Sequence, residues 1–189
     1  MANQLNKKAR HMVMLLRHDP QGLSMDKQAY VAVQDIINFY KITKDDLDRI
    51  VASDNKTRFG YNHDQTKIRA NQGHSLDFVN IKFNEITLEN LDNYFAGQTQ
   101  PFIYHGTAQH NLDSINEKGL LKMDRTHVHL SFDRETASKV GTRHKESKDD
   151  DLVVLELDVQ SYLRAGNKLY VSENNVVLAD EVEPKFLGL

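Results

Sequence analysis

Cysteine is absent from this 189-residue chain, so neither disulfide bonds nor thiolate metal ligands can contribute to its structure. Long apolar runs are also missing, since no stretch approaches the ~20 residues that a membrane-spanning helix requires. The first residues lack the apolar core of a signal peptide, and no internal repeat or low-complexity segment is present. We therefore expect a soluble, cytoplasmic monomer that has no membrane partner.

The net charge of −3 is unevenly distributed along the chain. Residues 1–83 contain 13 Lys and Arg against 9 Asp and Glu, whereas residues 84–189 contain 11 against 18. A basic half joined to an acidic half favours docking of an anionic polymer on the first half, although an excess of +4 is also common on ordinary surfaces.

The first half has the pattern of three helices closed by a hairpin. Apolar residues at helical spacing predict a helix over residues 5–16, and Asp19-Pro20 and Gly22 stop it, so Arg17 and His18 fall at its carboxyl end. Further elements are expected as a strand at 30–33, a helix at 34–40, a helix over 43–53 capped by Thr43, and a hairpin of 58–61 with 67–70. This order is similar to a winged-helix module.

The second half alternates short strands with inserted helices. Strands are predicted at 102–104, 128–130, 152–157, 169–171 and 176–178, and helices at 109–117 and 134–140. Because the connections are short and irregular, we predict an α+β fold instead of a parallel doubly wound sheet. Residues 141–151 are polar and predict a mobile loop. We place the lobe boundary near residue 90, giving lobes of 1–90 and 91–189.

One stretch, residues 125–131, carries an unusual set of polar side chains. On an extended backbone Arg125, His127, His129 and Ser131 would share one face, and Val128 would turn to the core. A guanidinium, imidazoles and a hydroxyl suit a ligand with phosphate and sugar groups, although a polar outer strand face is the simpler reading of this pattern alone.

A second polar stretch follows the predicted strand at 102–104. Gly106 would let backbone amides approach a ligand, His105 and Thr107 supply polar contacts, and the next helix offers its amino-terminal end. Taken alone, the stretch is an ordinary strand-to-helix turn.

Four blocks of the chain together resemble the RNA 2'-phosphotransferases, in the family's order. They are Leu16-Arg17-His18-Asp19-Pro20, Ile68-Arg69-Ala70-Asn71-Gln72-Gly73-His74-Ser75, Tyr104-His105-Gly106-Thr107 and Met123-Asp124-Arg125-Thr126-His127-Val128-His129-Leu130-Ser131. Softer matches at 140–144 and 172–178 extend the resemblance almost to the end of the chain.

The resemblance implies an amino-terminal winged-helix lobe for RNA and a carboxyl-terminal lobe of the ADP-ribosyltransferase type that binds NAD+. It also implies a reaction in which an internal RNA 2'-phosphate, as left at a tRNA splice junction, attacks ribose C1 of NAD+ and expels nicotinamide. The ribose 2-hydroxyl then attacks the phosphate, which leaves 2'-OH RNA and ADP-ribose 1'',2''-cyclic phosphate. NAD+ is thus a consumed co-substrate, and no metal is expected.

The family's Arg-His-Arg-Arg quartet corresponds to Arg17, His18, Arg69 and Arg125, which are expected to be catalytic. Fixed cations suit the second step, which concentrates charge on phosphorus. The other roles are assigned as follows: RNA binding to Arg17, His18, Arg69, His74 and Ser75, and NAD+ binding to His105, Gly106, Thr107, His127, Ser131 and Arg143. The alternative for one of His127 and His129 is a satisfied structural histidine. Arg143 is equally well read as a solvated surface residue.

This chain departs from the family pattern at three places. Family members usually have Pro at Lys122, Gly at Asn175, and Gly-Trp-Val at Ala29-Tyr30-Val31. Asn tolerates the positive φ that Gly allows, so we expect only local effects. Residues 146–151 are longer and more acidic than the family loop, which would weaken polynucleotide binding nearby.

Three alternatives remain open at this point. The same residues would serve a transferase that stops at ADP-ribosylated nucleic acid, and a non-catalytic RNA or ADP-ribose binding module would need fewer of them. The third alternative is a metal site of His105, His127 and His129, which lacks a carboxylate partner in these motifs.

Overall fold

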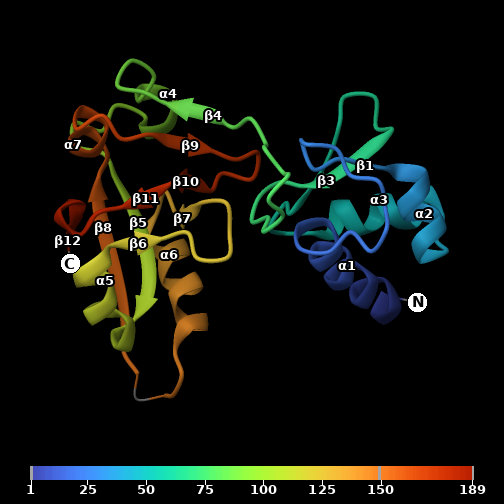
Figure 1. Ribbon diagram of the computed structural model, residues 1–189, viewed down its shortest axis with the longest axis horizontal. Helices are drawn as coiled ribbons and strands as arrows, with labels where there is room; N and C mark the ends of the chain where they lie inside the picture. Colours follow the sequence, from blue (N-terminus) through green and yellow to red (C-terminus); the bar gives the residue numbers. More distant parts are fainter. Residues whose placement is uncertain (1, 149, 189) are drawn as a thin grey trace. The chain divides into compact units, whose positions relative to one another are not determined.

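The computed structural model describes residues 2–148 and 150–188, and the chain divides by its internal contacts into two compact units (Figure 1). The first unit contains the residues up to Lys82 together with Asp124–Thr126. The second contains Phe83–Met123 and the residues from His127 onward. Within the described ranges, no helix is both long and apolar enough to cross a membrane.

The first unit packs helices on a small antiparallel sheet. Its strand order is β1-β3-β2, with Val31 opposite Ile68 and Gly60 opposite Arg69. The elements are α1 (Ala2–Arg17), β1 (Val31–Ala32), α2 (Val33–Tyr40), α3 (Lys44–Ser53), β2 (Phe59–Tyr61) and β3 (Lys67–Ala70). The predicted helices, strand and hairpin of this half are therefore confirmed.

Local signals in the sequence account for the ends of these elements. Thr43 caps α3, since its hydroxyl accepts from the Asp46 N–H at 3.1 Å and its own N–H donates to the Asp46 carboxylate at 3.3 Å. In the hairpin turn, the Asn62 carbonyl oxygen Oδ1 accepts from the Lys67 N–H at 2.9 Å. The apolar stripe of α1 supplies Met12 and Leu16 to the core of this unit, where both are fully buried.

The second unit is built from short antiparallel pairs. Its sheets have the orders β4-β9-β10-β7, β12-β8-β5 and β11-β6. The elements are β4 (Asn84–Ile86), α4 (Asp92–Phe95), β5 (Phe102–Ala108), η1 (Gln109–Asn111), α5 (Leu112–Lys118), β6 (Leu120–Leu121), β7 (Val128–Leu130), α6 (Arg134–Gly141), η2 (Thr142–His144), β8 (Leu152–Asp158), α7 (Val159–Arg164), β9 (Leu169–Val171), β10 (Val177–Ala179), β11 (Glu181–Val182), η3 (Pro184–Phe186) and β12 (Leu187–Gly188). The prediction of a mixed α+β chain without a parallel doubly wound sheet is confirmed.

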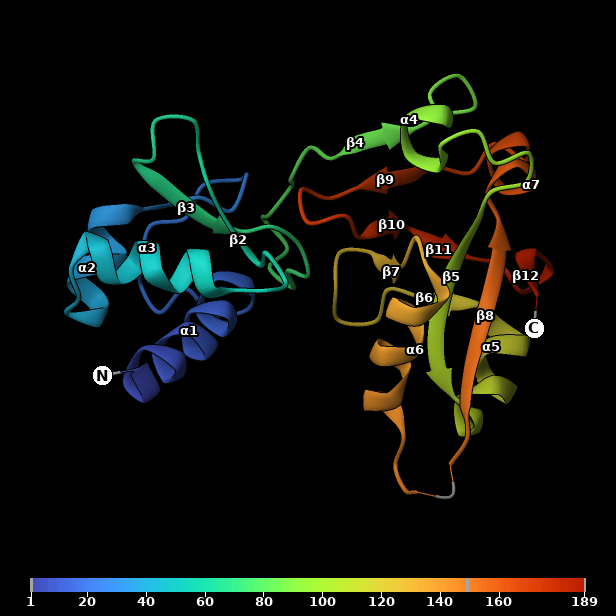
Figure 2. The same ribbon diagram turned by 180° about the vertical axis from the view of Figure 1, so that it is seen from behind.

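Helix α6 lies directly on the β5–β8 pair, as Figures 1 and 2 show from opposite sides. The approach is so close that a Cβ added at Gly106 would lie 1.8 Å from the Ala137 carbonyl oxygen. A Cβ added at Gly141 would lie 2.7 Å from the Gly106 carbonyl carbon. Gly141 thus ends α6 in a packed position, and the polar loop predicted to begin there begins with the η2 turn. Asp149 of that loop lies outside the described residues.

Two of the departures from the family pattern fall on left-handed backbone. Ala29 has φ +64° and is fully buried, and Asn175 has φ +56°. Asn adopts this conformation at lower cost than Ala does, because its short polar side chain can hydrogen-bond locally. The expectation for Asn175 is confirmed, and Ala29 holds a strained conformation next to Tyr30.

Candidate functional site

Arg17 and His18 lie at the carboxyl end of α1, as predicted. The His18 N–H donates to the Met14 carbonyl at 2.9 Å and completes the last helical turn. The Ser75 N–H donates to the Arg17 carbonyl at 3.0 Å, and the Ser75 hydroxyl is hydrogen-bonded to Nδ1 of His18 at 2.8 Å. Residues that are 57 apart in the sequence are therefore held together at one helix end.

Gly73 makes room for the Arg17 side chain. Its φ is +86°, and an added Cβ would lie 3.3 Å from Cζ of Arg17. The guanidinium therefore packs against the bare Cα of Gly73, where a larger residue would be both strained and crowded.

Arg69 enters the same region from β3. Its side chain is only 6% exposed, and its Nη1 atom donates to the Gln28 carbonyl at 3.2 Å. Its Cζ lies 4.6 Å from the centroid of the Tyr30 ring, a cation–π distance. The sequence indicated Arg69 but not these two partners, Gln28 and Tyr30, which precede and follow the strained Ala29.

Arg125 does not lie on an extended strand, so this part of the sequence prediction is wrong. Strand β7 begins at Val128, and residues 125–127 form a bend that turns Arg125 out of register with Ser131. The segment Asp124–Thr126 belongs by its contacts to the first unit, where the Thr126 N–H donates to the His74 carbonyl at 3.0 Å. Strand parity could not reveal this arrangement.

The four members of the Arg-His-Arg-Arg quartet thus lie in one unit, where Arg17, His18 and Arg125 interact electrostatically. Burial lowers the pKa of Arg17 to about 10, assisted by the charges of Arg125 and Arg58 and opposed by Asp54. Burial, followed by the charges of Arg17 and Arg125, also lowers the pKa of His18. Cations that lower the pKa values of Arg17 and His18 form a site that an anion would stabilise.

His74 lies in the interior of this cluster and is 1% exposed. Burial, together with the charges of Arg17, Arg69 and His18, lowers its pKa to about 3, so its imidazole is neutral at pH 7. Among the described residues, Nε of Arg17 and Nε2 of His74 are buried polar atoms without a hydrogen-bond partner. These two nitrogen atoms could therefore form hydrogen bonds with a bound ligand.

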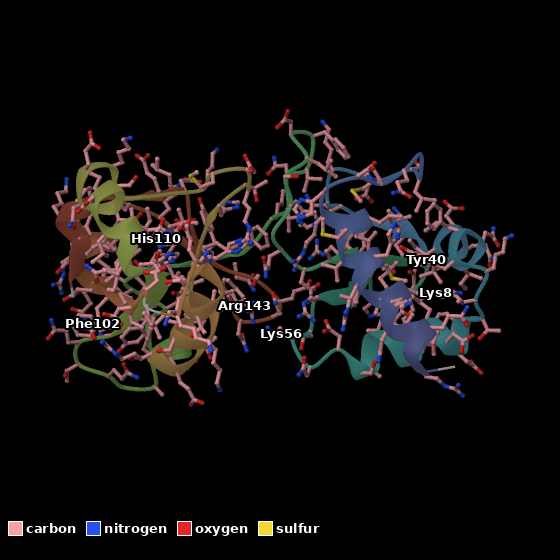
Figure 3. The ribbon with its side chains drawn as sticks, turned by 90° about the horizontal axis from the view of Figure 1, so that it is seen from below. Lys8, Tyr40, Lys56, Phe102, His110 and Arg143 are labelled. Atoms are coloured by element: carbon pink, nitrogen blue, oxygen red, sulfur yellow. The ribbon has the colours of Figure 1, made fainter. Side chains whose placement is uncertain are left out.

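The residues predicted to bind NAD+ all lie in the second unit. Most of them are buried or partly buried in its strands and the adjoining bends. His105 is on β5, with Nδ1 3.0 Å from the His129 carbonyl oxygen, and Ser131 exchanges backbone hydrogen bonds with Tyr104 at 2.8 and 2.9 Å. Thr107 is 4% exposed. Arg143 is exposed in η2 and is labelled in Figure 3.

Gly106 has a role that the sequence did not indicate. The position where its Cβ would be is filled by the backbone of α6, so this glycine is required for helix-on-sheet packing. The face of β5 that carries His105 and Thr107 is the opposite one, because side chains alternate along a strand.

His127 packs between two aromatic rings. Its ring centroid lies 5.6 Å from that of Phe83 and 6.0 Å from that of Tyr170, both in edge-on geometry. Burial lowers the pKa of His127, against the opposing charge of Asp180, whose Oδ1 lies 3.9 Å from Nε2. Within the described part of the chain, no three His, Asp or Glu side chains are grouped to hold a metal ion, so the alternative site of His105, His127 and His129 is not formed.

Comparisons with known proteins agree with the motifs. Residues 3–181 match the RNA 2'-phosphotransferase, Tpt1 / KptA family. A probable RNA 2'-phosphotransferase of Fusobacterium nucleatum is 39% identical over 96% of each chain. Proteins of the same description from Flavobacterium johnsoniae and Trichormus variabilis are 39% and 36% identical, over 95% and 92% of this chain and 93% and 90% of their own.

Proposed function

Because this chain belongs to the RNA 2'-phosphotransferase, Tpt1 / KptA family, we propose that it removes an internal RNA 2'-phosphate by transferring it to NAD+. The products are RNA with a 2'-hydroxyl, ADP-ribose 1'',2''-cyclic phosphate and nicotinamide. The observation that carries this proposal is the gathering of Arg17, His18, Arg69 and Arg125 in one unit, with the pKa values of Arg17 and His18 lowered partly by neighbouring cations. Such a cluster fits a phosphate better than a neutral ligand.

In the first step, a 2'-phosphate oxygen attacks ribose C1 of NAD+, and nicotinamide leaves with the electrons of the broken bond. A phosphate oxygen is already a nucleophile, so this step chiefly requires positioning. Arg17 and Arg69 are suited to it because each is held rigidly, Arg17 against Gly73 and Arg69 between the Gln28 carbonyl and the Tyr30 ring.

In the second step, the ribose 2-hydroxyl attacks phosphorus, and the RNA 2'-oxygen leaves. The hydroxyl loses a proton and the departing oxygen gains one. His18 is neutral at pH 7 because of its lowered pKa, so it can accept the first proton, and a bound phosphate would raise that pKa and help it to carry the charge. The charge on phosphorus is stabilised by the arginines, with Arg125 placed at the junction of phosphate and ribose.

The remaining roles follow from position. His74 is buried, so its place supports positioning of Arg17 and Arg69 more than direct contact with RNA, while the partly exposed Ser75 orients His18. For NAD+, we propose contacts from His105 and Ser131, both partly exposed, with His127 and Arg143 as further candidates. Gly106 and Thr107 are less suited to contact, because both are packed inside the second unit. We further propose a winged-helix fold for the first unit and an ADP-ribosyltransferase-like fold for the second.

The test uses the full chain, NAD+ and an end-labelled RNA that bears one internal 2'-phosphate. Conversion to 2'-OH RNA, with ADP-ribose cyclic phosphate as coproduct, is the expected result. Persistent ADP-ribosylated RNA would instead identify a transferase that stops halfway. Absence of NAD+ consumption would contradict the proposal and leave a binding module.

A further inference from the structure

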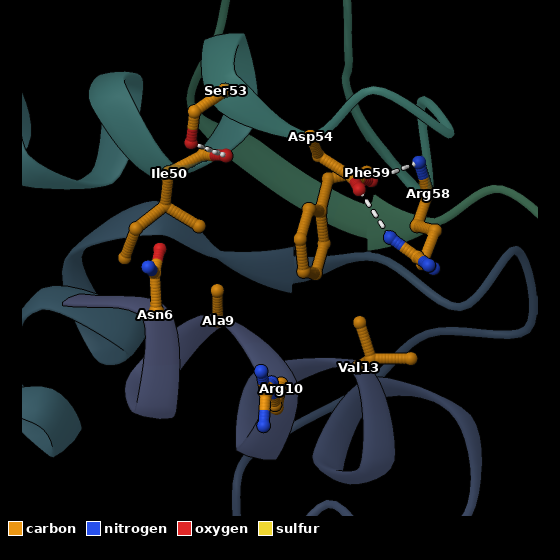
Figure 4. Close-up of a pocket in the computed structure, with 9 residues that line it drawn as sticks. All are labelled: Asn6, Ala9, Arg10, Val13, Ile50, Ser53, Asp54, Arg58 and Phe59. Atoms are coloured by element: carbon orange, nitrogen blue, oxygen red, sulfur yellow. Dashed lines mark hydrogen bonds and ion pairs between the residues drawn. The ribbon is translucent and has the colours of Figure 1, made fainter. Parts of the chain in front are cut away.

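A groove lies between α1 and α3 of the first unit, apart from the quartet. Figure 4 shows its lining, with the Phe59 ring directed between the two helices. Its volume is about 340 Å³, within the range of small-ligand sites. The residues that line it are Asn6, Ala9, Arg10, Val13, Ile50, Ser53, Asp54, Arg58 and Phe59.

The floor and the rim of the groove differ in chemistry. Ile50 and Phe59 are 2% and 3% exposed and, with Ala9 and Val13, give an apolar floor. On the rim, Arg58 is ion-paired with Asp54, so the exposed guanidinium of Arg10 carries the net positive charge. An apolar floor under a cationic rim is the combination by which proteins hold single-stranded nucleic acid.

The groove and the quartet share one face of α1. Arg10 and Arg17 are seven residues apart, or about two helical turns, which places them on one face and about 10 Å apart along the axis. Val13 lies between them on the same face. Arg58 connects the two regions electrostatically, since it both lines the groove and acts on the charge of Arg17.

We propose that this groove binds the RNA strand that flanks the 2'-phosphate, with Arg10 holding a backbone phosphate and the apolar floor packing against a sugar or base. The inference rests on the proposed function, because it extends the strand whose 2'-phosphate lies at Arg17. It assigns a binding role to Arg10, Ser53 and Phe59, none of which lies in the four blocks of the quartet and NAD+ motifs.

The test is fluorescence anisotropy of the full chain with a labelled single-stranded RNA of about twelve nucleotides, carrying one internal 2'-phosphate. Arg10→Ala removes one phosphate contact and is expected to weaken binding about tenfold and to reduce the salt dependence by about 0.7 in slope. Ser53→Glu places a negative charge on the rim and is expected to weaken binding to a similar extent. Both positions are exposed, so the folded state is expected to persist.

Matched controls exist on α3. Arg49→Ala removes an exposed arginine that is absent from the groove lining, and Ala52→Glu adds an acid one residue from Ser53. Both controls should bind the RNA as the wild type does. If Arg10→Ala and Ser53→Glu weaken binding no more than their controls, the proposal is overturned.

Two further RNAs separate this inference from the proposed function. A dinucleotide with a 2'-phosphate is too short to reach the groove, so Arg10→Ala should change its affinity less than about twofold; an equal loss on both lengths would refute the groove. The long RNA without its 2'-phosphate should still depend on Arg10. If the wild type shows no preference for the 2'-phosphate and no turnover, while Arg10→Ala still weakens binding, the proposed function fails and the groove stands.

Discussion

The two units use their motif residues differently. In the first, Arg17 and His18 lie at the end of a helix and Arg69 lies on a short strand, and, within the described residues, Nε of Arg17 and Nε2 of His74 are buried without a hydrogen-bond partner. In the second, Gly106 and Thr107 are buried in the packing of β5. A block shared with a family can therefore include residues that pack the scaffold as well as residues with polar atoms left for a ligand. The following predictions test this contrast.

The largest effect is expected for Arg125→Ala. Arg125 is exposed, so folding should be spared, while loss of one fixed cation should slow the second step by ~2.7–4 kcal/mol and cause ADP-ribosylated RNA to accumulate. Time courses with end-labelled RNA measure this. Arg164→Ala, at an exposed arginine of α7, should behave as the wild type does. Completion of the reaction at the wild-type rate by Arg125→Ala would remove this residue from the mechanism.

Gly106→Ala tests the scaffold side of the contrast. The new methyl group would lie 1.8 Å from the Ala137 carbonyl oxygen, which is backbone and cannot rotate away. We expect a loss of about 3 kcal/mol or more in the free energy of unfolding, measured by urea denaturation. Gly188→Ala is the control, since its Cβ would find nothing closer than 3.9 Å. A folded, stable Gly106→Ala protein with weakened NAD+ binding would instead place Gly106 in the ligand site.

His74 should make stability depend on pH. Its pKa in the folded state, about 3, lies below the ordinary value of 6.5, so between these values the unfolded chain binds the extra proton. Stability therefore rises with pH in this window and falls as pH drops below 6.5, with a slope of up to about 1.4 kcal/mol per pH unit from this residue. Urea denaturation from pH 6.5 to about 5, where most carboxylates stay ionised, measures the slope. His74→Gln should flatten it, and equal slopes in both proteins would count against a buried neutral His74.

The smallest effect concerns the strained residue beside the Arg69 partners. Ala29→Gly removes a left-handed Ala at φ +64° and should stabilise the protein by about 1 kcal/mol, less the entropy cost of Gly. Ala32→Gly, at a residue with ordinary backbone, should destabilise it. Thermal unfolding measures both, and a lower Tm for Ala29→Gly would show that the strain is relieved by packing.

The sequence was most informative where structure is local. The amino-terminal end of helix α3 was predicted correctly because Thr43 and Asp46 supply a complete capping box. The two-residue strands β6 and β11 were missed, because each exists only by pairing with the other, some sixty residues away along the chain. Helix α7 was also missed, although Asp158 caps it by accepting from the Ser161 N–H at 2.9 Å. Asp158 directly follows a run of apolar strand residues, so the sequence there was read only as the end of a strand.

In the candidate site, too, placements that depend on nearby residues were predicted and those that depend on distant contacts were not. The positions of Arg17 and His18 followed from the end of the α1 pattern, which is a property of nearby residues. The unit to which Arg125 belongs could not be predicted, since the bend at 125–127 and the Thr126 hydrogen bond to His74 depend on contacts across more than fifty residues. Alternation along a strand assumes that the strand continues, and here it does not.

Because Asp124–Thr126 belongs to the first unit, that unit is not one contiguous segment of the chain. This limits where the chain can be truncated or recombined. A gene fragment that stops at Lys82 would encode nearly all of that unit and yet omit Arg125. If segments were exchanged between homologues at a point between the two units, Arg125 and Thr126 would come from one parent, and His74, whose carbonyl accepts from the Thr126 N–H, would come from the other. Chimaeras and truncations of this chain should therefore carry residues 124–126 and 74 from the same parent.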